Sequence, residues 1–200
     1  MLTLLATGML AGLALIVAIG AQNAYVLRQG LARDHVGTVV VICTVSDVVL
    51  IAAGVAGIGV LVEQAGWALV LIRWLGVAFL TWYGVSSLLR ARRGGSLRTN
   101  GGTAGRRTSV AVKALALTWL NPHVYLDTVI LLGSIANTHG ADGRWWFGAG
   151  AMVASALWFG VLGFGAHRAH GLLATERAWR VLDVLIGLTM LGIAVSLAQG

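Results

Sequence analysis

The 200-residue chain has little charge, one cysteine and one proline. Only 10% of its residues are charged and 58% are hydrophobic, whereas an ordinary soluble domain has about 25% charged residues. The composition therefore excludes a soluble domain and indicates a protein of the lipid bilayer. The lone cysteine, Cys43, excludes an internal disulfide and a dithiol pair for electron relay.

Motifs for chemistry are also missing. The five histidines are scattered over different apolar runs and loops, without the spacing of metal ligands. The chain has no Ser-His-Asp, P-loop or dinucleotide-binding signature. We therefore expect the protein not to be an enzyme, and we predict no cofactor and no metal site.

What the chain has instead is long apolar runs. A helix needs about 20 mostly apolar residues to cross a bilayer, and six runs meet this length. The runs are 3–27, 36–62, 67–89, 112–136, 145–166 and 179–198. The first lacks the basic start and the cleavage site of a signal peptide, so we expect it to be retained. The predicted fold is an all-α membrane protein with six transmembrane helices.

The formal net charge of +7 comes from basic residues that flank the apolar runs. Three loops on one side hold most of them, namely Arg28, Arg33, Arg90, Arg92, Arg93, Arg98, Arg106, Arg107, Lys113, Arg168, Arg177 and Arg180. The opposite side has only Arg73 and Arg144. This distribution is typical of membrane topology and argues against nucleic acid as a partner. The positive-inside rule predicts cytoplasmic basic loops and both termini outside.

The chain divides into two halves of three runs each. Residues 91–110 are rich in Gly, Arg and Ser and predict a cytoplasmic linker between a first repeat, 1–90, and a second, 111–200. Ordered matches support the repeat: GVAGIG against GVLGFG, Tyr25 against Tyr125, and RWLGV against RVLDV. Because three is an odd number, the halves would be inverted. Inverted repeats are a recurring transporter architecture, with substrate bound between the halves.

Two carboxylates fall inside the apolar runs. Asp47 lies about 16 Å into the second run, near the bilayer midplane, where a charge is costly unless it faces a cavity or a partner. Two interpretations compete, and they do not exclude each other: an ion pair with a residue such as Arg73, and a site that binds a cation or carries a proton. Asp127 is the second carboxylate, in the fourth run. Two acidic groups favour a substrate with positive charge.

The fourth run contains the only proline, Pro122. Since proline lacks an N–H and clashes with the preceding turn, the helix is expected to break near Asn121. The freed carbonyls and the side chains of Asn121, His123 and Tyr125 then provide contacts for a polar ligand.

The first run has a polar insertion of its own. Gly20 loosens the helix there, and Gln22 and Asn23 bring amides that donate and accept hydrogen bonds. Together with the fourth run, these groups provide partners for both ends of a zwitterion. The alternative is structural, because amides also cross-link helices in membranes.

Other residues are expected to serve the scaffold. Asp183, at the start of the sixth run, is predicted to pair with Arg177 or Arg180 at the membrane interface. Small residues are predicted at close helix contacts: Gly8, Gly12 and the clusters that begin at Gly54 and Gly160.

Three stretches, GAQNAYVLRQG, CTVSDVVLIAAG and TWLNPHVYLDTVILLGS, occur in that order, and ASALWFG follows at 154–160. With them the chain resembles the LysE/ArgO family of basic amino-acid exporters of the bacterial inner membrane. The resemblance implies export of L-lysine or L-arginine, and of analogues such as canavanine, driven by the proton motive force. It places the family's important aspartates on Asp47 and Asp127 and its Asn-Pro kink on Asn121–Pro122. Ala21 departs from this pattern, since some relatives have a proline there, before the Gln-Asn pair.

The sequence thus predicts a proton-coupled secondary transporter of cationic amino acids. Its partners would be a basic amino acid, protons and the bilayer, and a homo-oligomer stays open. An exporter of neutral amino acids or of another small metabolite is the nearest alternative. A membrane subunit that transports nothing and binds a partner protein is the alternative from another class.

Overall fold

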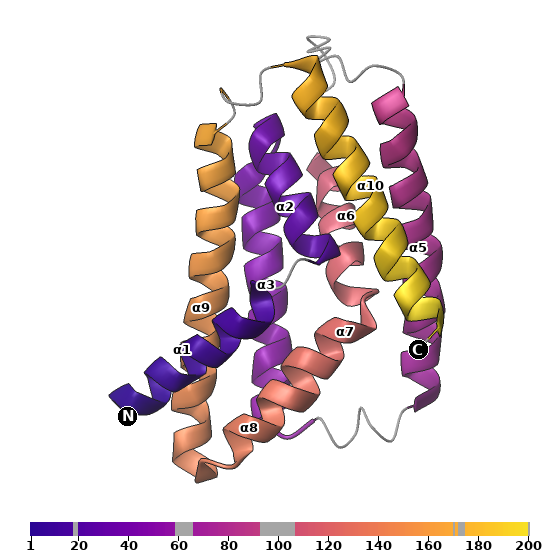
Figure 1. Cartoon of the computed structure of the whole chain (residues 1–200). Coiled ribbons are helices and arrows are strands. Elements are labelled where there is room, and N and C mark those ends of the chain that lie inside the picture. Colours follow the sequence, from indigo (N-terminus) through magenta and orange to yellow (C-terminus); the bar gives the residue numbers. More distant parts are fainter. Residues whose placement is uncertain (18–19, 59–65, 93–106, 170, 172–174, 200) are drawn as a thin grey trace.

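The computed structural model describes residues 1–17, 20–58, 66–92, 107–169, 171 and 175–199, and within them it contains helices and no strand (Figure 1). The elements are α1 (Leu2–Ile16), α2 (Ala21–Ala32), α3 (Val36–Val55), α5 (Gly66–Arg92), α6 (Arg107–Trp119), α7 (Pro122–Val124), the π-helix η1 (Tyr125–Leu132), α8 (Gly133–Asn137), α9 (Gly140–Ala169) and α10 (Glu176–Gln199).

Four helices are long and apolar enough to cross a membrane singly. They are α3, α5, α9 and α10, with 20, 27, 30 and 24 residues. Two bent pairs complete six spans: α1 with α2, bent by 83°, and α6 with the segment Pro122–Asn137, bent by 60°. The predicted fold class, six spans of which the first and fourth are broken, is confirmed.

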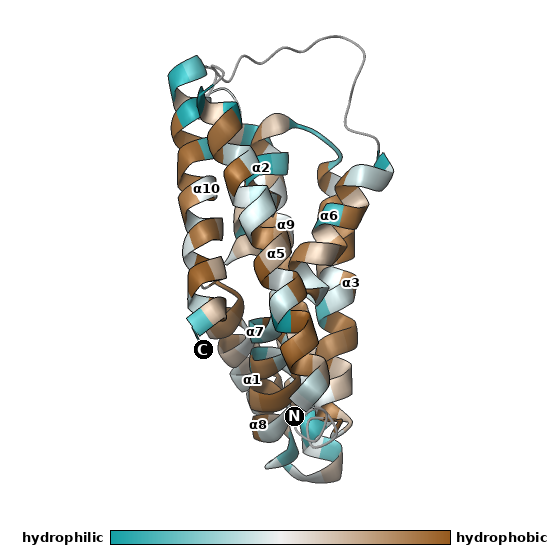
Figure 2. Ribbon diagram, turned by 90° about the vertical axis from the view of Figure 1, so that its right-hand side faces the viewer, coloured by the Kyte–Doolittle hydropathy of each residue, from teal (hydrophilic) through white to brown (hydrophobic). Residues whose placement is uncertain are grey.

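The outer surface of these helices is apolar. On α3 the exposed large side chains Val41, Val45 and Val49 recur every four residues, so they form one stripe. On α10, Val181, Leu185 and Leu188 are exposed in the same way. Figure 2 shows hydrophobic residues along the lengths of the helices and many of the hydrophilic ones at the upper end. Such a surface is stable in contact with lipid rather than water.

Both helix breaks have a local cause. Gly20 precedes α2 in an extended conformation, with φ −121° and ψ 171°. Asn121 precedes α7 with φ −102° and ψ 107°, because the residue before a proline is disfavoured in the helical region. Pro122 then occupies the first helical position, where no N–H is needed.

Close packing at glycines holds α1 against α9. A Cβ atom at Gly8 would collide with the carbonyl of Phe147, and one at Gly12 would lie 2.9 Å from the Cα of Ala151. These two scaffold predictions are confirmed, and Gly54 of α3 packs in the same way on backbone atoms of η1. In the cluster that begins at Gly160, the first glycine is open, since nothing lies within 4 Å of a Cβ placed there. Gly163, one turn further along α9, makes the contact instead.

Helices α5 and α10 form a pair. They run side by side in Figure 1, and Gly84 of α5 faces Gly187 of α10 backbone to backbone. The predicted linker 91–110 lies for the most part outside the described residues; helix α5 reaches into its start and α6 into its end. The repeat boundaries 1–90 and 111–200 stay a prediction.

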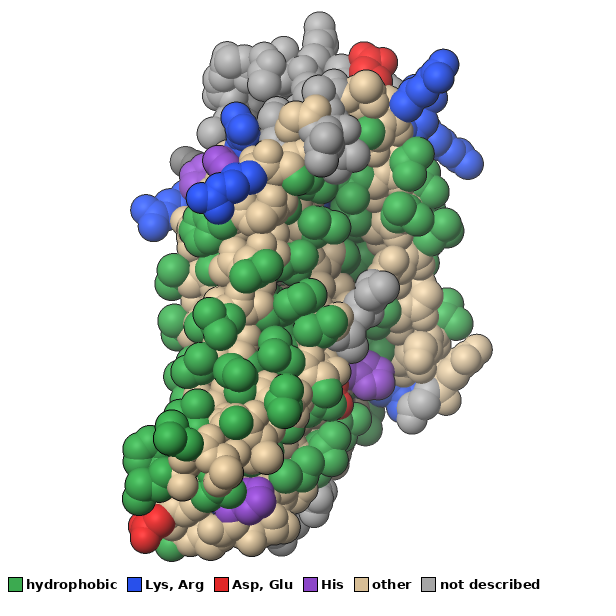
Figure 3. Space-filling view, turned by 60° about the vertical axis from the view of Figure 1, so that its left-hand side comes forward, with side chains coloured by type: hydrophobic (Ala, Val, Ile, Leu, Met, Phe, Trp, Pro, Cys, Tyr) green, Lys and Arg blue, Asp and Glu red, His purple; other side chains and the backbone are tan. Residues whose placement is uncertain are grey.

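Charge separates the two ends of the molecule. The ends of α2, α5, α6, α9 and α10 that lie at the top of Figure 1 carry most of the basic residues, and we call this the basic end. On the face in Figure 3, most of the visible Lys and Arg side chains gather there, while hydrophobic side chains cover the flank below. Both chain termini lie in the opposite half.

Candidate functional site

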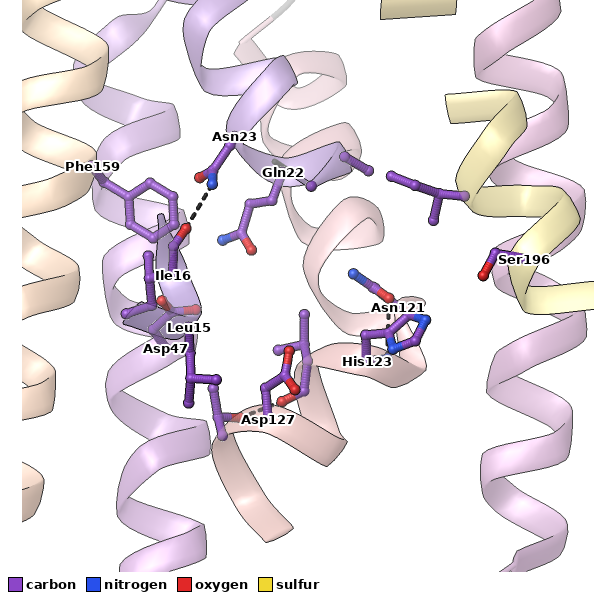
Figure 4. A pocket seen from close by; sticks show the side chains of 15 residues that line it. Leu15, Ile16, Gln22, Asn23, Asp47, Asn121, His123, Asp127, Phe159 and Ser196 are labelled. Carbon is purple, nitrogen blue, oxygen red and sulfur yellow. Dashed lines mark hydrogen bonds between the residues drawn. The ribbon is translucent and has the colours of Figure 1, made fainter. Parts of the chain in front are cut away.

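A cavity of about 320 Å³ lies where the two broken spans meet (Figure 4). This size is within the range of small-molecule pockets. Its wall consists of residues from both breaks and from α3, α9 and α10: Leu15, Ile16, Gly20, Ala21, Gln22, Asn23, Asp47, Asn121, His123, Val124, Asp127, Thr128, Phe159, Ile193 and Ser196. Both membrane carboxylates and most of the polar residues predicted for the site are therefore brought together.

Asp47 lies on the cavity wall with only 3% of its surface exposed. The hydroxyl of Ser155, on α9, donates a hydrogen bond of 2.8 Å to its Oδ2 atom. One of our interpretations expected Arg73 to pair with Asp47, but the structure does not place the two residues together. Arg73 instead donates to the carbonyl of Ala198, 2.9 Å away near the end of α10. Within the described chain Asp47 thus faces the cavity without a cationic partner.

Asp127 belongs to the π-helix η1 and is partly exposed in the cavity. Among the described residues it forms neither a hydrogen bond nor a salt bridge, so its carboxylate is available to a ligand. Sequence periodicity predicted the helix but not its π geometry. A π-helical turn shifts side chains relative to an α-helix and is frequent at functional sites.

The amides of the first break have different roles. Asn23 makes contacts between helices: its Nδ2 donates to the carbonyl of Ile16 at 2.7 Å, and its Oδ1 accepts from Nε1 of Trp158 at 3.2 Å. It thereby joins the end of α1 to α2 and α9. Gln22 is different, because its Nε2 atom is buried without a hydrogen-bond partner. Figure 4 shows its side chain projecting into the cavity, where a bound ligand would satisfy the donor.

At the second break, nearby side chains form hydrogen bonds with the backbone groups that the break releases. The Oδ1 atom of Asn121 accepts a 3.1 Å hydrogen bond from the backbone N–H of His123, which caps the new helix. Tyr125 is not on the cavity wall; its hydroxyl donates to the carbonyl of Trp119 at 2.9 Å. In an unbroken helix that carbonyl would accept from residue 123, so Tyr125 satisfies a group that the break releases. His123 lines the cavity and is exposed.

Several wall residues were not predicted. Ser155, Phe159, Thr128, Ile193 and Ser196 line or support the cavity, yet none is charged or stands out in an apolar run. The stretch ASALWFG supplies Ser155, Trp158 and Phe159, although its only signal in the sequence is the family resemblance. A signal for Ser155 existed in principle, since a buried hydroxyl in a membrane helix needs a partner.

A second polar cluster lies toward the basic end. Asp183 is buried, with 3% exposed, and its Oδ1 atom lies 3.2 Å from Nε of Arg28 and 3.5 Å from Nη2 of Arg90. The expected pairing with Arg177 or Arg180 is wrong. Asp183 belongs to the buried stripe of α10, with Trp179 and Gly187, which turns it toward α2 and α5 rather than toward the membrane interface.

The fold and the site together define a class: a multi-pass membrane protein with a polar cavity between broken spans. A family model described as "LysE type translocator" matches residues 13–200, and the chain belongs to this family. The "Lysine exporter LysE" of Corynebacterium diphtheriae is 40% identical over 92% of this chain and 93% of that protein. The "Arginine exporter protein ArgO" of Enterobacter sp. is 42% identical over 96% and 92%.

A Mycobacterium tuberculosis protein is also similar, with 46% identity over 90% of this chain and 89% of its own length. No solved structure matches the chain. The predicted membership of the LysE/ArgO family is therefore confirmed, and the family is one of transporters.

Proposed function

We propose that the protein is a secondary active transporter that exports a cationic amino acid, L-arginine or L-lysine, in exchange for protons. The observation that carries the proposal is the pair Asp47 and Asp127, which share one cavity and form no salt bridge among the described residues. Relatives named as lysine and arginine exporters support it.

The cavity offers groups for each part of such a substrate. The cationic side chain would lie against the two carboxylates, as a charge at membrane depth requires a partner. The α-carboxylate would bind at the start of α2, where the N–H groups of Ala21 and Gln22 have no partner within the helix and the helix dipole is positive. The free amide nitrogen of Gln22 would add another donor.

Proton coupling follows from the cost of an isolated charge in a dry cavity. When the substrate leaves, Asp47 and Asp127 lose its positive charge, and a proton is the simplest replacement. When the cavity opens again to the cytoplasm, the next substrate displaces the proton, which is released on that side. Export and proton entry then share the same carboxylates, which is the arrangement an exchanger requires.

We place the protein in the bacterial inner membrane, with the basic end in the cytoplasm and both termini outside, because cytoplasmic loops carry the excess of Lys and Arg. A reporter fused to the C-terminus that is active only outside the cytoplasm should be active. Activity of a cytoplasm-only reporter at the same position would reverse the orientation.

The test of the substrate is counterflow into proteoliposomes that contain the purified protein alone. We expect uptake of labelled arginine or lysine and little uptake of threonine or leucine. The reverse preference would establish an exporter of neutral amino acids, and an absence of all flux would favour a subunit that needs a partner protein.

The test of the site is Asp47→Asn in cells challenged with canavanine. The variant should lose protection at an unchanged amount in the membrane, because the cationic side chain loses a carboxylate. Asp142→Asn is the matched control, since Asp142 is exposed in the first turn of α9, outside the cavity. Full protection by Asp47→Asn would remove Asp47 from substrate binding.

A further inference from the structure

The ion pair between Arg28 and Asp183 joins the two elements that border the cavity. Asn23 of α2 and Ile193 of α10 line the cavity. Arg28 lies five residues further along α2, about 7.5 Å, and Asp183 lies ten residues back along α10, about 15 Å, both toward the basic end. Their contact of 3.2 Å therefore holds α2 and α10 together between the cavity and that end.

The two arginines at Asp183 are held differently. Arg90 comes from α5, which packs closely on α10, and its guanidinium is fixed by the hydroxyl of Ser87 and by the ring of Tyr83, 5.7 Å from the ring centre. Arg28 comes from α2, across the boundary between the helix pair and the rest of the molecule. Among the described residues, Arg28 forms a single side-chain hydrogen bond, and Asp183 accepts it.

A layer of polar groups continues from Arg90 across this boundary. The ring of Tyr83 meets that of Tyr25 edge to face at 5.9 Å, and the hydroxyl of Tyr25 accepts from Nε2 of Gln29 at 2.8 Å. The Oε1 atom of Gln29 is buried without a hydrogen-bond partner. A carboxylate and an unsatisfied carbonyl oxygen are the acceptors that a guanidinium or ammonium group requires.

We propose that Asp183 is a second binding site for the cationic side chain of the substrate, which the guanidinium of Arg28 occupies in this conformation. The inference rests on the proposed function, since it takes the substrate to be a basic amino acid. Arg28 presents the same chemical group as arginine, so the two exchange at one carboxylate. The ion pair between Asp183 and Arg90 persists when the substrate binds. The substrate replaces Arg28, so Asp183 never faces three cations.

Equilibrium binding of labelled arginine to the purified full-length protein tests the proposal. Arg28→Gln empties the site, so it should bind an additional arginine per chain that the native protein does not bind. The double variant Arg28→Gln with Asp183→Asn should lose that additional arginine, while it keeps the one bound in the main cavity. Equal binding by the single and double variants would overturn the proposal.

Transport gives a second readout that a purely structural role would not produce. In proteoliposomes of known orientation, Asp183→Asn should raise the half-saturating arginine concentration about tenfold on the side of the basic end and leave it unchanged on the other. The uncharged isostere citrulline should compete equally with the native protein and the variant. A variant with unchanged concentration dependence on both sides, or with equal losses on both, contradicts the site at Asp183.

Failure of this inference differs from failure of the proposed function. If the native protein transports neither arginine nor lysine, the proposed function fails. If the native protein transports them and Asp183→Asn behaves as Asp142→Asn does, only the second site fails.

Discussion

The hydroxyl of Ser155 donates to Oδ2 of Asp47 across 2.8 Å, and the two residues are 108 positions apart in the chain. The bond joins α3 to α9 at the wall of the cavity. Because this carboxylate forms no salt bridge among the described residues, the bond from Ser155 is what orients it. We therefore treat Ser155 as a positioning residue.

Removal of this hydroxyl should weaken substrate binding without abolishing transport. A hydrogen bond to a charged group contributes about 1.5 kcal/mol, so Ser155→Ala should raise the half-saturating arginine concentration about tenfold. Counterflow at a series of arginine concentrations measures it. Ser134→Ala is the control, since the Ser134 hydroxyl is exposed and bonds only to the carbonyl of Leu131, one turn back. If Ser155→Ala and Ser134→Ala show the same dependence of counterflow on arginine concentration, Ser155 does not position Asp47 for substrate binding.

Asp127 should connect transport to the pH gradient. Efflux of labelled arginine from loaded vesicles is expected to accelerate when the external solution is made acidic, because incoming protons replace the departing cation. The Asn side chain cannot exchange a proton, so in Asp127→Asn the stimulation of efflux by the pH gradient should fall about tenfold. Counterflow at equal pH on both sides should persist. If the variant responds to the gradient like the native protein, Asp127 has no part in coupling.

Tyr125 should matter for stability rather than for substrate affinity. Tyr125→Phe removes the donor to the carbonyl of Trp119, which costs about 1 kcal/mol and lowers the melting temperature by about 2–4 °C. Thermal unfolding in detergent measures the shift, and arginine counterflow of the remaining folded protein should show an unchanged half-saturating concentration. A large rise in that concentration would instead support the direct contact that the sequence suggested.

The glycine contact between α1 and α9 should tolerate no side chain. Gly8→Ala places a methyl group against the carbonyl of Phe147, so the helices must separate, and less folded protein should reach the membrane. Gly160→Ala is the matched control on α9, because nothing lies within 4 Å of its added Cβ. Detergent-extracted monodisperse protein is the measurement, and an equal yield of the two variants would contradict the packing argument.

Local sequence was sufficient for the spans and for both breaks. Long apolar runs specify membrane helices, since backbone groups in lipid must be satisfied within the helix. Pro122 and Gly20 specify where two of those helices are interrupted, because a missing N–H and a missing Cβ act on the neighbouring turn alone. The carboxylates Asp47 and Asp127 could be assigned to the cavity for a similar reason: their burial cost makes them conspicuous in an apolar run.

Side-chain contacts between residues far apart in the chain could not be predicted from local sequence. Asp183 is close in sequence to Arg177 and Arg180 but pairs with Arg28, 155 positions away, and Arg73 bonds to Ala198 rather than to Asp47. Which side chains meet depends on how each helix is rotated and how closely glycines allow the backbones to approach.

The sequence by itself determined a six-span membrane protein with two broken helices and two carboxylates at membrane depth. Only the tertiary structure decided that Ser155 bonds to Asp47, that the Tyr125 hydroxyl bonds to the carbonyl of Trp119 released by the break, and that Asp183 of α10 pairs with Arg28 of α2. The physical reason is range: solvation and backbone chemistry act within a few residues, whereas hydrogen bonds and ion pairs form only between groups that packing brings within about 3 Å.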